Sequence, residues 1–268
     1  MPENIRLWWQ SFFAFYKQAI SISATYRAQA ALWMISKIMP LIMLMIWLHL
    51  AKEKPIGGYN QSDFSIYYMF LFVAYQLTPI WAIYRMDQNI RQGNLAPQLM
   101  RPINPMWYLV AEHWGEMTIR LPIVLGIFVI GVLSTGVFDL IEWHRLPLFG
   151  LAIFLGWWVT FALHYALSAL VFWTDSITYF DSLIYRLFIL FGGVSLPLTF
   201  YPEWVQKILF LSPFPYVFYF PTRIMIGEIS GIEMIQDFGL TLFWILFFTL
   251  LYRFLWRLGL KRFSAVGQ

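Results

Sequence analysis

RMDQNIRQGNLAPQLMRPINP, residues 85–105, is the only sizeable polar interruption between the early hydrophobic stretches of this chain. Hydrophobic segments run into it and out of it, so it lies at one face of a membrane. It carries three arginines and one aspartate, and loops rich in Arg and Lys face the cytoplasm. Asp87 and Arg91 stand four residues apart with the acid first, which predicts a short helix that ends at Gly93 and Pro97. A short surface helix between two spans suits docking against a partner protein.

The composition identifies an integral membrane protein. Hydrophobic residues make up 60% of the 268-residue chain and charged residues 12%, whereas an ordinary soluble domain has roughly 25% charged residues. The net charge of +4 comes from basic residues at the ends of the apolar stretches, where they set topology and meet lipid headgroups. We therefore expect no nucleic-acid partner. Cysteine is absent, which excludes disulfides and thiol chemistry.

Six stretches approach the roughly 20 residues that a helix needs to cross a bilayer. We expect one all-α transmembrane domain, 1–268, with spans at about 30–50, 65–84, 117–138, 147–173, 184–201 and 236–256. Lys37 is close enough to the cytoplasmic end of the first span to extend its ammonium group to the interface. This topology places thirteen Lys and Arg inside and five outside, with both termini cytoplasmic.

Two further segments are expected to lie at the membrane surface. Residues 4–26 place aromatic bulk on one helical face and basic residues on the other, which is typical of a helix in the headgroup plane; a poor first span is the alternative. Residues 202–235 contain several prolines that prevent a full crossing. We expect re-entrant or interfacial half-helices there, on the outer side.

The fourth span carries a stripe of small and polar residues at four-residue intervals. Two interpretations stay open, close helix packing or the lining of a transport route. The fifth span contains Gly192-Gly193, where we expect a break. The stripe comprises Gly156, Thr160, His164 and Ser168, preceded by Ala152.

Motifs for catalysis are scarce. Gly-Lys does not occur, so the chain has no phosphate-binding GxxxxGK[ST] loop and any ATP is bound by another chain. Glu112, His113 and Glu116 form the only plausible metal or catalytic cluster, but Glu116 also stands four residues before Arg120 and can pair with it. A second candidate, Asp175 with Asp181, lies at span ends, where cap or solvated roles compete with a proton relay.

This order of features resembles the permease subunits of type-2 ABC transporters, mostly exporters. Arg91-Gln-Gly-Asn-Leu95 followed by Leu99-Met-Arg-Pro-Ile103 is similar to the R-x-G-x-L … L-x-R-P loop of a bacterial subgroup of these permeases. The ending Leu260-Lys-Arg-Phe-Ser-Ala-Val-Gly267 is similar to that subgroup's K-R-Y-S-A-x-G. The resemblance covers essentially the whole chain.

The resemblance implies a non-catalytic, multi-pass subunit of a bacterial inner membrane. Its partners would be separate ATP-binding subunits, which bind ATP and Mg, a second permease that is the same chain or a sister, and membrane lipid. Spans one, two and five would line the path, and the 85–105 loop would be the coupling helix. The residues assigned to coupling are Arg85, Asp87, Arg91, Gln92, Gly93, Asn94, Leu95 and Arg101.

Other interpretations compete with this one. The 85–105 loop is otherwise an ordinary membrane-edge loop anchored to headgroups. A secondary transporter would need intramembrane acids for ion coupling and repeated halves, and neither is evident. A membrane-embedded enzyme would have to use the Glu112 cluster. The sequence leaves open the substrate, the direction of transport, the lining of the path and the choice between homodimer and heterodimer.

Overall fold

A computed structural model describes residues 3–78, 80–101, 103–174 and 177–262. The fold is all-helical, with 79% helix and no strand among these residues. Asp175 and the end of the chain from residue 263 lie outside them, including most of the KRFSAVG tail. The helices are α1 Glu3–Thr25, α2 Arg27–Ser36, α3 Met39–Leu50, α4 Gln61–Leu77, α5 Ala82–Arg91, α6 Leu95–Leu99, α7 Pro105–Thr135, α8 Leu146–Ser168, α9 Thr178–Phe191, α10 Glu203–Phe210, α11 Tyr219–Met225 and α12 Gly231–Leu260.

Five helical stretches of the described chain are long and apolar enough to cross a membrane. The expected span at 184–201 is not one continuous helix, because α9 ends at Phe191 and a turn at Gly192-Gly193 follows. The sixth crossing therefore stays a prediction. The five stretches are Ala31–Leu50, Gln61–Arg91, Pro105–Thr135, Trp143–Phe172 and Gly231–Leu260.

Helix α4 is the centre of the molecule and is buried on all sides. Its sequence from Phe64 to Leu77 is almost wholly apolar or aromatic, so it has no polar face to turn outward. A reciprocal cap begins the helix: Asn60 Oδ1 accepts from the Asp63 amide at 3.0 Å, and Asp63 Oδ2 accepts from the Asn60 amide at 2.9 Å. Helices α3, α7, α8 and α11 pack around it.

Two helix boundaries differ from the expected spans. The first span is divided at Lys37, with α2 before it and α3 after it, and Pro40 lies in the first turn of α3. The helix of the second span ends at Leu77, and a new helix begins at Ala82 rather than at residue 85. Pro79 has no amide hydrogen to continue the α4 ladder, which accounts for the early end.

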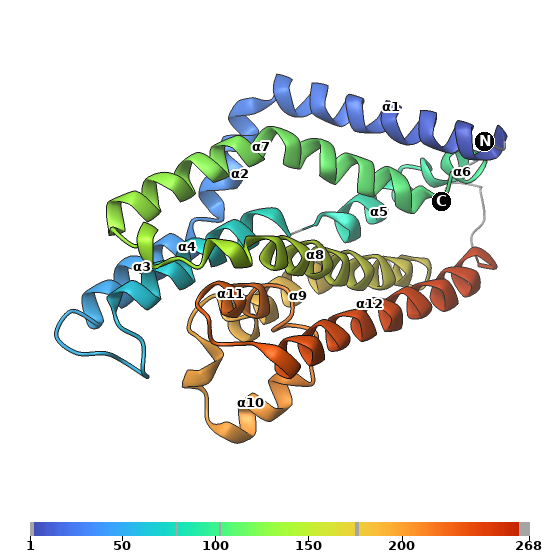
Figure 1. Ribbon diagram of the computed structural model, residues 1–268. Coiled ribbons are helices and arrows are strands. Elements are labelled where there is room, and N and C mark those ends of the chain that lie inside the picture. Colours follow the sequence, from blue (N-terminus) through green and yellow to red (C-terminus); the bar gives the residue numbers. More distant parts are fainter. Residues whose placement is uncertain (1–2, 79, 102, 175–176, 263–268) are drawn as a thin grey trace.

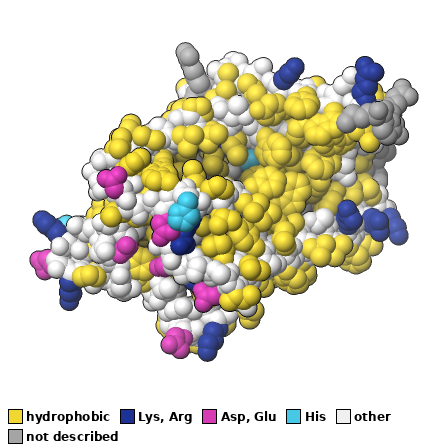
Figure 2. All heavy atoms as spheres, viewed as in Figure 1, with side chains coloured by type: hydrophobic (Ala, Val, Ile, Leu, Met, Phe, Trp, Pro, Cys, Tyr) yellow, Lys and Arg dark blue, Asp and Glu magenta, His cyan; other side chains and the backbone are white. Residues whose placement is uncertain are grey.

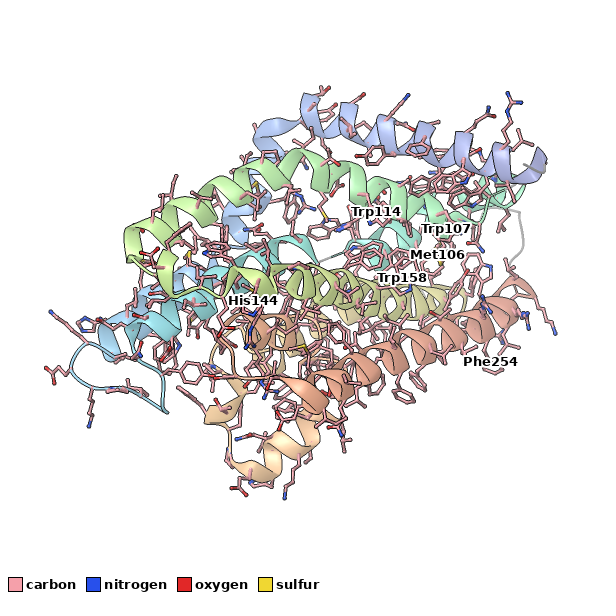
Figure 3. The ribbon with its side chains drawn as sticks, viewed as in Figure 1. Met106, Trp107, Trp114, His144, Trp158 and Phe254 are labelled. Carbon is pink, nitrogen blue, oxygen red and sulfur yellow. The ribbon has the colours of Figure 1, made fainter. Side chains whose placement is uncertain are left out.

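Helix α1 packs along the first half of α7 (Figure 1). Gly115 makes this approach possible, because a Cβ atom there would lie 2.6 Å from the Cβ of Ala19. Aromatic rings complete the contact: Trp107 lies 5.1 Å from Trp8 and 6.2 Å from Trp158, between centroids. Figure 3 shows Trp107 and Trp114 of α7 on the side toward Trp158 of α8. A second apolar row on α1, Ile5, Trp9 and Phe13, stays exposed.

The charged side chains gather at the two ends of the molecule. In Figure 1 the start of α1, helix α6 and the end of α12 lie at the same end, and the α3–α4 loop and α10 lie toward the other. Figure 2 shows a broad hydrophobic band between the ends, with Lys and Arg but no acidic side chain at the α6 end of this face. The cytoplasmic position of both termini stays a prediction.

Candidate functional site

Helix α5 is amphipathic and lies between α7 and α8 in Figure 1. Ile83 and Met86 are fully buried, and the helix packs against α8 and α9. The predicted pair is present: Arg91 Nε donates to Asp87 Oδ2 at 2.9 Å, while the arginine side chain stays 49% exposed. Asp87 itself is buried. Its carboxylate therefore holds the Arg91 side chain at Nε, while the rest of the guanidinium group faces solvent.

The tip of the loop is a tight turn formed by Arg91, Gln92, Gly93 and Asn94, all exposed. Gly93 has φ of +72°, which L residues with a side chain rarely adopt, and no heavy atom lies within 4 Å of the place where its Cβ would be. Within this chain the glycine therefore serves backbone conformation rather than close packing. Asn94 Nδ2 donates to Gln92 Oε1 at 3.1 Å across the turn.

The rest of the loop is anchored to the body of the protein. Leu95 is fully buried in an apolar cluster with Ile103. The Arg101 guanidinium is exposed but lies over two aromatic rings, 5.6 Å from Phe15 of α1 and 5.7 Å from Tyr108 of α7. The exposed Arg91–Asn94 turn is thus followed by residues that pack against α1 and α7.

An ion pair joins α5 to α7, between Arg85 Nη2 and Glu112 Oε1. The pair lines a cavity of about 410 Å³ between α1, α5 and α7, which Arg101 and Glu116 also line. A rotation of α5 would therefore pull on α7 directly through this pair.

The predicted Glu112, His113 and Glu116 cluster does not converge. Glu112 pairs with Arg85, and Glu116 lies 3.9 Å from Arg120, as the spacing of four predicts. His113 is buried, with Nε2 3.2 Å from the Leu77 carbonyl oxygen and its ring stacked on Trp157. Among the described residues no three His, Asp or Glu side chains are grouped to hold a metal ion.

The stripe on α8 divides between two environments. A Cβ at Gly156 would lie 2.9 Å from the Tyr216 carbonyl oxygen, so this end of the stripe allows close packing. Thr160 and His164 line a second cavity, and Ser168 is buried with its hydroxyl donating to the Tyr165 carbonyl oxygen at 2.7 Å. Four residues rotate about 400° around a helix, so each step drifts about 40° and the ends of the stripe face different neighbours.

The second cavity has a volume of about 350 Å³ and lies between α2, α4, α8 and α9. Its polar lining comes from separate elements: Lys37 at the α2–α3 break, Thr160 and His164 on α8, and Asp181 on α9. His164 Nε2 lies 3.7 Å from Asp181 Oδ1, and its Nδ1 lies 2.7 Å from the Thr160 carbonyl oxygen. The Asp181 carboxyl of α9 therefore faces a histidine of the preceding helix α8.

Lys37 is the residue that the sequence interpretation placed wrongly. It does not extend to the interface: it is only 4% exposed, and its Nζ lies 5.3 Å from the centroid of the Trp81 ring. Nζ has no hydrogen-bond partner in the described part of the chain. The available signal was a lysine inside an apolar span, three residues before Pro40.

Gly192 and Gly193 form the turn after α9 and pack against α4 and the loop before α11. Gly193 has φ of +85°, and a Cβ there would lie 2.6 Å from the Tyr67 hydroxyl. At Gly192 a Cβ would lie 2.9 Å from the Phe218 ring. At these two residues, as at Gly156, an added Cβ would lie within 3.0 Å of a neighbouring segment.

A multi-pass, all-helical membrane protein with a structured polar loop after its second apolar stretch is the class that this geometry defines. A family model described as "ABC-2 family transporter protein" matches residues 34–267, so the chain belongs to the ABC-2 family of membrane transport permeases. A search of curated proteins finds no match.

Proposed function

We propose that this chain is the permease subunit of an ATP-driven exporter and that helices α5 and α6 are its docking point for a separate ATP-binding subunit. The observation that carries the proposal is the exposed Arg91–Asn94 turn on an anchored base. Asp87, Leu95 and Arg101 fix that base, so a force applied at the tip moves the whole segment.

The coupling step follows from this rigidity. Closure of two ATP-binding subunits is a rigid-body movement, and a docked helix follows it. Helix α5 transmits the movement by two routes, through the chain toward α4 and through the Arg85–Glu112 pair to α7. Two copies of this permease, or this chain and a sister, enclose the substrate path, with ATP and Mg bound outside the chain.

The rival proposal is a secondary transporter. The buried His164 and the half-buried Asp181 form an acid–base pair that could couple protons to transport. The exposed coupling turn has no role in such a transporter, which is why we favour the ATP-driven function.

A pull-down tests the proposal. The tagged chain is purified in mild detergent from its native host, and the co-purifying proteins are identified by mass spectrometry and assayed for ATP hydrolysis. We expect an ATP-binding subunit with the wild type and with Arg253→Gln, an exposed control on α12, and its loss with Arg91→Gln. A folded chain that purifies alone and inert would overturn the proposal and favour the secondary transporter.

A further inference from the structure

We propose that the 350 Å³ cavity between α2, α4, α8 and α9 binds an amphipathic anion, with its charged head at Lys37 and its apolar part against the aromatic wall. That this anion is also the transported substrate is a further assignment, and it alone rests on the proposed function. The binding itself is a property of the single chain.

The first argument is the state of Lys37. A buried amino group without a hydrogen bond is costly to ionise, because desolvation of the charged form is not compensated. Nζ has no such partner among the described residues, and its contact with Trp81 offsets only part of this cost. Lys37 and Trp81 both line this cavity. An anion placed in the cavity would supply the missing partner.

The second argument is the balance of charge. The cavity has one acidic lining side chain, Asp181, and its Oδ1 already lies 3.7 Å from His164 Nε2. Burial raises the pKa of the Asp181 carboxyl, against the opposing effect of His164. Arg120 and Glu116 do not line the cavity, but both interact electrostatically with Lys37. Their opposite charges lie 3.9 Å from each other, so neither is a free partner for Lys37. Lys37 is thus the basic lining group that has no partner within the protein. A ligand at this site should therefore be an anion rather than a cation.

The third argument is the shape of the ligand. The rest of the lining is largely aromatic, so the site offers one charged point and a broad apolar wall. A volume of about 350 Å³ is at the lower end of the range for small-molecule pockets, roughly 300–1,000 Å³. It accommodates a head group and the first part of a chain. The aromatic lining residues are Trp33, Tyr75, Trp81, Tyr185, Phe188 and Phe218.

Position supports access from the membrane. Lys37 lies six residues after Ala31, the start of the first candidate span, so it is about 9 Å from that end at 1.5 Å per residue. In the predicted topology this end is cytoplasmic. Trp33 is exposed on the α2 side and Ser182 on the α9 side, so an amphiphile can enter from the inner leaflet between these helices.

The test measures binding to the full chain in phosphatidylcholine nanodiscs, with empty nanodiscs as background. The probes share an eight-carbon chain: radiolabelled octyl phosphate, octyltrimethylammonium and octanol. We expect saturable binding of octyl phosphate to one site per chain, with at least tenfold weaker binding of the other two. Tighter binding of octyltrimethylammonium, or no saturable binding of octyl phosphate, would overturn the proposal.

Three variants locate the site. Lys37→Gln should weaken octyl phosphate binding at least tenfold and raise the ligand-free unfolding temperature, because an unpartnered buried charge is removed. Ser182→Trp should block binding by filling the cavity from its exposed side while leaving Lys37 intact. Lys207→Gln, an exposed lysine on α10, is the matched control and should bind as the wild type does. Unchanged binding in both cavity variants would refute the assignment.

A further arm separates two sources of the anionic head. If phosphatidylglycerol in the nanodiscs displaces octyl phosphate, a membrane lipid occupies the site; if it does not, the site selects a separate amphiphile. Both results support anion binding at Lys37. Since no ATP-binding subunit is present, failure of the pull-down with intact octyl phosphate binding would reject the exporter proposal alone.

Discussion

The hydroxyl of Tyr67 donates a hydrogen bond of 2.7 Å to the carbonyl oxygen of Gly193. The bond joins the buried helix α4 to the turn that ends α9. Nearby, Tyr68 donates to the carbonyl oxygen of Ser195 at 3.2 Å. The irregular backbone after α9 thus has its carbonyl groups satisfied by tyrosines of the central helix, as a segment inside an apolar region requires.

Removal of the Tyr67 hydroxyl should destabilise the protein. Tyr67→Phe leaves the Gly193 carbonyl unpaired, and we expect the free energy of unfolding to fall by about 1–3 kcal/mol. Gly193→Ala should have a larger effect, because it adds strain at φ of +85° and a steric clash with the same hydroxyl. Thermal unfolding in detergent checks both. Gly150→Ala is the control, since its Cβ would meet no atom within 4 Å, and it should be neutral or slightly stabilising.

Substitutions of different size at position 93 should distinguish an effect on the turn from an effect on docking. Gly93→Ala adds only backbone strain of about 1–2 kcal/mol, because the surrounding space is open. We expect it to retain the ATP-binding subunit in the pull-down. Gly93→Trp has comparable backbone strain but places a large ring on the proposed docking surface, so it should lose the subunit. Equal retention by the two variants would argue against docking at this turn.

The Arg85–Glu112 pair should couple α5 to α7 more than it stabilises the fold. Both side chains are about one-third or more exposed, so we expect the pair to contribute no more than about 1 kcal/mol to stability. Arg85→Glu and Glu112→Arg should each lower substrate transport per ATP hydrolysed in proteoliposomes. The double exchange restores the opposite charges and should recover coupling. If the double exchange does not recover coupling, the Arg85–Glu112 pair does not transmit the movement from α5 to α7.

The stability of the protein should depend on pH through Glu228, which lies between α11 and α12. Burial raises the pKa of this carboxyl above 4.5, although the Tyr59 hydroxyl and Arg223 favour its charged form. The folded protein then retains the Glu228 proton to a higher pH than the unfolded chain does. Stability should fall as pH rises from 4.5 through the raised pKa. The unfolding temperature of Glu228→Gln should lack this component of the pH dependence; parallel curves would contradict the assignment.

Local spacing predicted the elements that depend on neighbours in sequence. The Asp87–Arg91 and Glu116–Arg120 pairs follow from the helical interval of four, and the break at Gly192 follows from two adjacent glycines. Family membership was also predictable, because the loop motif is contiguous. Docking at the loop, the in-plane position of α1 and the outer half-helices stay predictions.

Long-range convergence was not readable from the sequence. Lys37, Thr160 and Asp181 come from different helices, and only the packing around α4 brings them to one cavity. The four-residue stripe on α8 looked like a single surface, but its drift separates Gly156 from His164. Likewise, Glu112 found a partner on α5, which no spacing within α7 predicts.

Because α4 has no free face, most of span two would not line the proposed path, although the resemblance implies that it does. Residues of span two other than those at its Tyr75 end, such as Tyr67 and Phe70, are enclosed by their own chain. In the proposed dimer, the second permease would therefore contact the outer helices of this chain rather than α4. Substitutions in α4 should consequently change how much protein accumulates in the membrane, whereas substitutions in α2 and α9 should change what is carried.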